Sequence, residues 1–177
     1  RGRQVLAQAV ALLGDGSLQK ELQALATRIS VKGNCSKELA ELGQPETERP
    51  CEVMAKPLND AAAVLELAKT CDAAACWMTK LADPAPLIKM RAAYELGRAE
   101  SADGVPGLVK LCGDEDVDVR AAALRALDWL ASVPAAKVNL QNAARQLAAQ
   151  LASDQGKTRF QKVDEDLRRV QFKLSRL

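Results

Sequence analysis

Five cysteines are the residues of this chain best suited to covalent chemistry. Cys71 and Cys76 flank a predicted corner between two helices, and Cys35 and Cys51 bracket a loop rich in Gly and Pro. Each pair is therefore a candidate disulfide, because a bond there would fasten an irregular segment. The alternative is that all five are small buried thiols, as cysteines often are. The corner positions favour disulfides and an oxidising compartment, and the odd count leaves at least one thiol unpaired within the chain.

Histidine is absent from the sequence. Its absence excludes Ser-His-Asp and Cys-His catalysis and every His-ligated metal, and no Cys-x-x-Cys spacing supports a zinc site. The glycines at Gly14 and Gly16 lack the preceding strand and the following Lys of a phosphate-binding loop. We therefore predict a protein that is not an enzyme, with no catalytic residue, no cofactor and no metal.

The densest acidic cluster is the stretch 114–118, in which four of the five residues are carboxylates. Such a cluster could bind calcium, or it could begin a helix, where free amides and the helix dipole favour negative charge. We expect the helix start. The nearby basic residues, which we expect to be solvated or to pair with the acidic turn of an adjacent unit, are Lys89, Arg91, Arg120 and Arg125.

The acidic cluster belongs to a segment that occurs twice. Residues 83–97 align with residues 114–128 at a constant offset (114 − 83 = 31), which matches Asp83 with Asp114 and Leu96 with Leu127. A fixed period of about 30 residues of helix-forming sequence is typical of a helical solenoid. Apolar residues four apart line one face of the first helix in each copy. They are Ile88, Ala92 and Leu96, then Val119, Ala123 and Leu127.

These residues resemble HEAT repeats of the short type that is also found in phycobilisome-lyase-like proteins. The pattern of that type is Asp-x-x-x-x-Val-Arg, followed by Ala-Ala and Ala-Leu-Gly. The matching residues are Asp114, Val119, Arg120 and Leu127 in one copy and Leu96 and Gly97 in the other, where Ile88 and Lys89 replace Val and Arg.

The resemblance implies an all-α fold, a short right-handed α-solenoid of HEAT-like helical hairpins with atypical capping helices at both ends. It also implies a non-enzymatic scaffold that binds another protein. The enzymatic alternatives within HEAT-like proteins are a lyase and a DNA glycosylase. A glycosylase needs a strongly basic face, which a chain of net charge +2 does not offer.

We expect a single domain over residues 1–177. Its parts are N-terminal helices at 1–43, an irregular Pro-rich loop at 44–58, HEAT-like repeats at 59–156 and a C-terminal helix at 157–177. Because the chain begins with Arg1 and shows no signal-like apolar region, we expect a processed or trimmed piece. The expected helix caps are Ser17, Asn59 and Asp72, and the repeat helices are expected to start at Asp83 and Asp114.

The two tryptophans, Trp77 and Trp129, are expected in the core. For Trp77 the alternative is an exposed anchor for a partner, since tryptophan is enriched at binding hot spots. The C-terminal helix carries apolar residues at spacings of 3 and 4, from Phe160 to Leu177. It either caps the solenoid or binds a partner or a second copy. Its candidate partner-binding residues are Arg159, Lys162, Arg168, Arg169 and Lys173.

Composition narrows the partners further. The near-neutral charge argues against nucleic acid, and the absence of any run of about 18 apolar residues argues against a membrane span. The partner is therefore expected to be another protein. A structural component of a bacterial cell envelope, periplasmic or lipoprotein-like, is the alternative function, and the candidate disulfides slightly favour a periplasmic or extracytoplasmic location over the cytoplasm.

Overall fold

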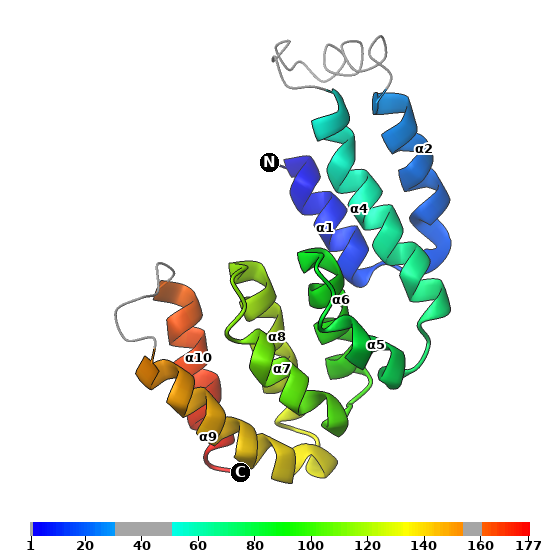
Figure 1. The fold of residues 1–177 in the computed structure, drawn as a ribbon. Coiled ribbons are helices and arrows are strands. Elements are labelled where there is room, and N and C mark those ends of the chain that lie inside the picture. Colours follow the sequence, from blue (N-terminus) through cyan, green and yellow to red (C-terminus); the bar gives the residue numbers. More distant parts are fainter. Residues whose placement is uncertain (1, 31–50, 154–160) are drawn as a thin grey trace. The chain divides into compact units, whose positions relative to one another are not determined.

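The computed structural model describes residues 2–30, 51–153 and 161–177, and all regular secondary structure within these ranges is helical (Figure 1). The predicted all-α solenoid class is confirmed. The chain divides into two compact units, Arg1–Asp72 and Ala73–Leu177, and each is described by itself. The single domain over 1–177 and the handedness of the solenoid stay predictions.

The first unit contains α1 (Gly2–Leu13), a 3-10 turn (Gly16–Leu18), α2 (Gln19–Ser30) and α4 (Cys51–Thr70). The long helix α4 packs against both α1 and α2 (Figure 1). The expected cap at Ser17 is wrong. Asp15, not Ser17, provides the side-chain acceptor, because its carboxylate accepts a hydrogen bond from the Ser17 amide at 2.9 Å.

The predicted irregular loop at 44–58 is wrong over residues 51–58, which form the first turns of α4 with Pro57 inside the helix. Pro57 removes one backbone hydrogen bond. Burial offsets this cost, since Ala55 and Leu58 pack with Ala26 and Ile29 of α2. Asn59 is therefore an interior residue of α4 rather than a cap. Residues 44–50 of the expected loop, and residues 31–43 of the expected N-terminal helices, lie outside the described residues.

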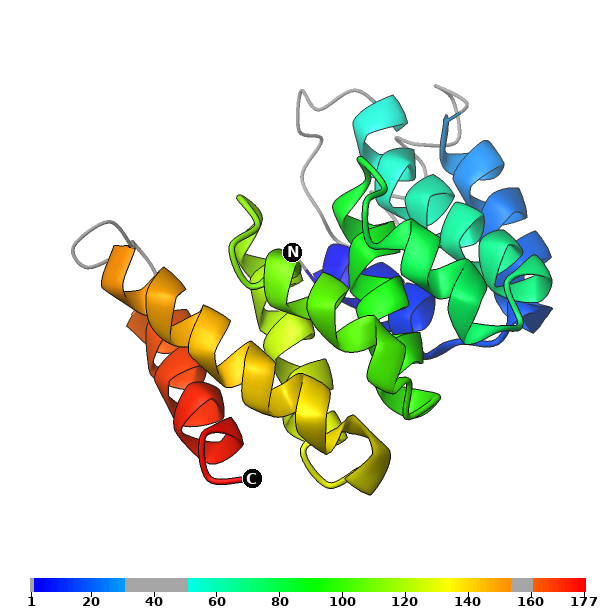
Figure 2. The same cartoon turned by 60° about the horizontal axis from the view of Figure 1, so that its bottom comes forward.

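The second unit begins with α5 (Ala74–Lys80) and continues through two helix pairs to a last helix. Helix α8 packs against both α6 and α10, and α7 packs against α8 and α9, so the first helices of successive pairs stand side by side (Figures 1 and 2). The helices are α6 (Pro86–Arg98), α7 (Val105–Leu111), α8 (Val117–Leu130), α9 (Lys137–Ser153) and α10 (Gln161–Leu174).

The two pairs repeat in register. Helices α6 and α8 start 31 residues apart (117 − 86 = 31), as the sequence alignment predicts. Helices α7 and α9 start 32 residues apart (137 − 105 = 32), because α8 has 14 residues where α6 has 13. A 3-10 turn precedes the second helix of each pair, at Ala102–Gly104 and Pro134–Ala136.

The predicted apolar stripes form the core of this unit, except that Ile88 is only partly buried. Ala92, Leu96, Ala123 and Leu127 are fully buried, as is Val119. Small residues allow α6 and α8 to approach closely: a Cβ added to Gly97 would lie 3.4 Å from the Cα of Ala126. Asp72, the expected cap of α5, is replaced by Ala73, which makes no side-chain capping bond. None of the described helices is both long enough and apolar enough to cross a bilayer.

Candidate interaction surface

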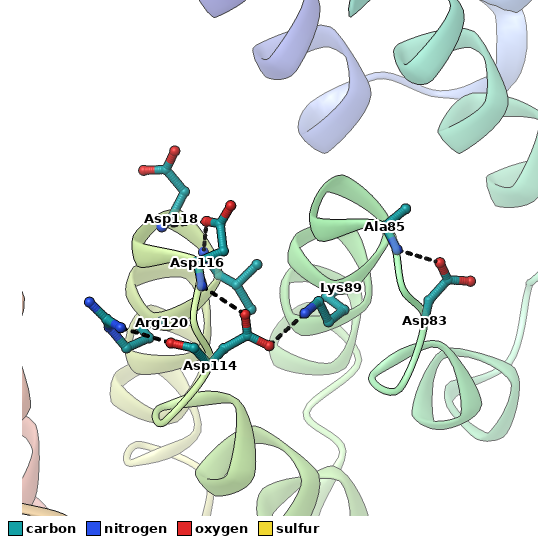
Figure 3. A network of polar contacts seen from close by, with 8 residues as sticks. Asp83, Ala85, Lys89, Asp114, Asp116, Asp118 and Arg120 are labelled. Carbon is teal, nitrogen blue, oxygen red and sulfur yellow. Dashed lines mark hydrogen bonds and ion pairs between the residues drawn. The ribbon is translucent and has the colours of Figure 1, made fainter.

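The turn that precedes each repeat has the same hydrogen bond in both copies. The Asp83 carboxylate accepts from the Ala85 amide at 2.9 Å, and the Asp114 carboxylate accepts from the Asp116 amide at 3.0 Å (Figure 3). The helices then begin at Pro86 and Val117, three residues after the expected starts. The aspartates shape the approach to the helix rather than the helix start itself.

Asp114 also joins two repeats. Its second carboxylate oxygen accepts a hydrogen bond from Lys89 Nζ of α6 at 2.5 Å, and its carbonyl oxygen accepts from Arg120 Nη1 at 2.8 Å (Figure 3). The expected pairing of Lys89 with the acidic turn of the next unit is confirmed. Partial burial by itself raises the pKa of Asp114. The bonds from Lys89 and the Asp116 amide, with the charge of Arg120, outweigh that effect and lower this pKa below its ordinary 3.8.

The acidic cluster begins a helix. Asp116 is the N-cap of α8, and its carboxylate accepts from the amides of Asp118 and Val119 at 2.8 and 3.1 Å. These bonds satisfy amides that have no partner within the helix. The helix-start alternative is therefore the one that the geometry supports. No group of three or more Cys, Asp or Glu side chains with the arrangement of a metal site occurs among the described residues.

Trp77 lies in the core, with 3% of its surface exposed, so the alternative of an exposed anchor is not supported. The guanidinium of Arg91 lies 6.0 Å from the centre of the Trp77 ring and 5.9 Å from the centre of the Tyr94 ring. Arg91 also forms an ion pair with the buried Glu95 at 2.6 Å. Burial of this charge is tolerated because the carboxylate and two aromatic faces surround it.

Trp129 was expected in the core, and this expectation is wrong: 52% of the residue is exposed. Its ring lies 6.0 Å from that of Tyr94 on α6. The repeat explains the exposure, because Trp129 is equivalent to Arg98 (129 − 98 = 31), which is also exposed. The small residue that follows the Ala-Leu pair in the first copy, Gly97, is matched by Asp128. Trp129 is one position further along, at the exposed position of Arg98. The 31-residue alignment contained the signal that could have placed it.

Helix α10 packs against α8 and α9, and Val170 and Leu174 of its apolar seam are buried. The capping alternative is therefore supported over a free dimerising seam for this part of the helix. Two of the candidate partner-binding residues of this helix form ion pairs. Arg169 pairs with Asp166 at 2.9 Å, and Lys173 pairs with Asp128 of α8 at 2.7 Å.

Three more basic residues of the C-terminal segment were candidates for partner binding: Arg159, Lys162 and Arg168. Arg168 is exposed. Lys162 belongs to α10, but its side chain lies outside the described part of the chain, as does all of Arg159. The involvement of any of these basic residues in partner binding stays a prediction.

Cys71 and Cys76 are each disulfide-bonded in the structure. Cys35 and the side chain of Cys51 lie outside the described residues, so their pairing stays a prediction. Cys112 is a free, buried thiol at the end of α7. Burial raises its pKa to about 12, since the thiolate would lose its hydration there. A thiol with this pKa is unsuited to nucleophilic chemistry near neutral pH.

Comparison with known proteins supplies one match. Residues 74–160 match the family model for HEAT repeats, over α5 to α9. The match does not distinguish the phycobilisome-lyase-like type. Neither the comparison with curated proteins nor that with solved structures gives a match. The repeat register, the stacked first helices and the matched segment agree with one another, and residues 74–160 of the chain are a HEAT-repeat segment.

Proposed function

We propose that this protein is a non-enzymatic scaffold for protein–protein interaction. The observation that carries the proposal is the stack of α6, α8 and α10, in which each first helix packs against the next and leaves its outer face to solvent. HEAT repeats generally serve as protein-interaction scaffolds, and a solenoid presents its side chains in rows that extend across several repeats.

Rigid junctions support this function, because a surface that is already ordered loses less entropy when it binds. Lys89 joins α6 to the turn before α8 through Asp114. Asn139 of α9 donates a hydrogen bond to the carbonyl oxygen of Ala102 in the preceding pair at 2.9 Å. Each link joins one repeat to the next, so the rows of exposed side chains are held in fixed register.

The test is site-specific photo-crosslinking in cells of the source organism. A photoreactive residue replaces Asp118 on α8 or Gln141 on α9, two exposed positions on different rows of helices. We expect a discrete protein adduct from at least one position, and the identified protein should then bind the purified full chain in a reconstituted assay. Absence of a protein adduct from both rows, or failure of every adduct to reconstitute, would contradict the scaffold function.

A second candidate function is a structural component of a bacterial cell envelope, and the Cys71–Cys76 disulfide is the observation that favours it. Disulfides persist in oxidising compartments. Thiol titration of the denatured protein, isolated under alkylating conditions, distinguishes the possibilities. Three thiols are expected with one disulfide, and one thiol if Cys35 and Cys51 are also joined. Five thiols would exclude the oxidising location.

A further inference from the structure

Three helices of the second unit carry the same kind of side-chain pair near their C-terminal ends. Each pair consists of one aromatic residue and one arginine four positions apart, so both lie on the same face of the helix. Trp129 and Phe172 are 52% and 60% exposed, and Tyr94 is partly exposed. The pairs are Tyr94 and Arg98 on α6, Arg125 and Trp129 on α8, and Phe172 on α10 with Arg176 in the turn directly after that helix.

The pairs occupy equivalent positions on the three helices. Between α6 and α8 the repeat offset of 31 matches Tyr94 with Arg125 and Arg98 with Trp129. Between α8 and α10 we align one buried pair of residues, four positions apart, from each helix. Val170 and Leu174 correspond to Ala123 and Leu127 (170 − 123 = 47 and 174 − 127 = 47). The same offset matches Phe172 with Arg125 and Arg176 with Trp129.

Aromatic and arginine side chains therefore alternate in both directions across these helices. One row contains Tyr94, Arg125 and Phe172, and the next contains Arg98, Trp129 and Arg176. Packed helices are about 8–10 Å apart, so the surface spans roughly 20 Å. We call these six residues the aromatic–arginine surface. The contacts already present within it are Tyr94 with Trp129, at 6.0 Å between ring centres, and Arg176 over Phe172, at 5.1 Å from the ring centre.

Positive charge on this surface exceeds negative charge. Arg98 pairs with Glu95, whose carboxylate also pairs with Arg91, and Lys173 beside the surface pairs with Asp128. Arg125 and Arg176 form no ion pair with any residue in the described ranges. Cations near helix C-termini are favoured by the helix dipole, which accounts for part of this pattern. The dipole does not account for exposed Trp and Phe rings beside them, and such exposed apolar area is typical of binding sites.

We propose that the aromatic–arginine surface binds an acidic peptide segment of a partner protein, one in which Asp or Glu residues flank an aromatic or large apolar side chain. Arginine forms paired hydrogen bonds with carboxylates, and the exposed rings offer flat contacts to an apolar side chain. This inference rests on the proposed scaffold function and names the class of partner. Single-stranded nucleic acid also combines negative charge with flat rings, but it requires a longer run of cations than these helices present.

The test measures binding of the full chain to fluorescent synthetic peptides by anisotropy. The probes are an array of peptides of about twelve residues, rich in Asp and Glu, with Phe, Trp or Leu at varied positions. Matched peptides with Lys in place of the acidic residues, and a thymidine oligonucleotide of similar length, are the comparison probes. We expect binding to acidic peptides that contain the apolar residue, no binding to their Lys counterparts, and weaker binding at high salt.

The variants Arg125→Glu and Trp129→Ala should each weaken binding about tenfold or more, since charged and aromatic residues at the centre of an interface dominate affinity. Arg145→Glu is the matched control, because Arg145 is an exposed arginine of α9 away from this surface. It should change affinity by less than about twofold. Circular dichroism and thermal melting verify that each variant is folded.

Three results would overturn the proposal: no peptide of the acidic array binds, Arg145→Glu weakens binding as much as Arg125→Glu, or the oligonucleotide binds more tightly than any peptide. A failure here is distinguishable from failure of the scaffold function. If photo-crosslinking yields a reconstituting partner whose affinity is unchanged by Arg125→Glu and Trp129→Ala, the scaffold function stands and binding occurs on another face.

Discussion

Asp114 performs two tasks that the sequence pattern by itself does not separate. One carboxylate oxygen holds the turn before α8, and the other holds Lys89 of the preceding helix. The repeat places an aspartate at position 83 as well, but the ion pair across the junction belongs to Asp114. A single side chain thus connects the local turn to the packing of two repeats.

Replacing Asp114 by Asn should lower the free energy of unfolding by about 1–3 kcal/mol at pH 7, since a charge-assisted bond to a partly buried lysine is lost. The pKa of Asp114 is lower in the folded protein than its ordinary 3.8. The carboxylate therefore stabilises the fold above about pH 4, and this contribution is lost as pH falls through the folded pKa. Denaturant titrations at pH 7 and pH 3 should show the difference between wild type and variant shrinking at pH 3.

Asp118→Asn is the matched control for this prediction, because Asp118 lies on the same turn with an exposed side chain. It should cost less than about 1 kcal/mol, the size of a charge–dipole contribution. Equal destabilisation by the two variants would contradict the role assigned to the Lys89–Asp114 pair.

Cys112 should resist alkylation in the native protein. Burial raises its pKa to about 12 and leaves almost no thiolate near neutral pH. Mass spectrometry after iodoacetamide treatment at pH 8 should find Cys112 unmodified in native protein and modified in denaturant. Rapid native modification would mean that α7 opens readily or that the thiol is not buried.

At the scale of the element, α10 completes the core of the repeats. Its Val170 and Leu174 cover apolar surface of α8 and α9 that would otherwise face water. The outer side of the same helix carries Phe172, and Arg176 in the following turn lies over its ring. One short helix therefore serves stability with one face and provides a candidate binding surface with the other, and substitutions can separate the two roles.

Leu174→Ala should destabilise the protein by about 2–5 kcal/mol, as for other large-to-small changes at fully buried positions. Phe172→Ala, two residues away and exposed, should cost less than about 1 kcal/mol. Chemical denaturation of both variants tests the contrast. If both variants lose similar stability, α10 is not docked as described.

At the scale of the whole molecule, the second unit is a linear stack in which stability depends on nearest neighbours. Helix α8 packs against two other first helices, α6 and α10. Among the described helices, α10 packs against only one first helix, α8. Hydrogen exchange measured by mass spectrometry should therefore show slower exchange for peptides from α8 than for peptides from α10. Equal protection in both helices would indicate a single cooperative core instead of a stack.

The sequence by itself determined the repeat, its 31-residue register and the residues of its buried stripes, because apolar side chains four apart leave one solution for burial between stacked helices. It left open whether Lys89 is solvated or pairs with an acidic turn, and the structure shows the pair with Asp114. Local patterns misplaced the caps at Ser17 and Asp72. The caps are Asp15 and Ala73 instead, and Ala73 makes no side-chain bond, because backbone geometry decides where each helix begins.

The tertiary structure decided which large residues face solvent, although the alignment of Trp129 with Arg98 already pointed to an outward position. Composition favours burying both tryptophans, yet Trp77 is enclosed beside Arg91 and Trp129 faces outward. The start of α4 at Cys51 was likewise decided by packing, because contacts with α2 offset the cost of Pro57. Propensity is a local property, whereas burial depends on which helix stands opposite, and a linear sequence does not state its neighbours in space.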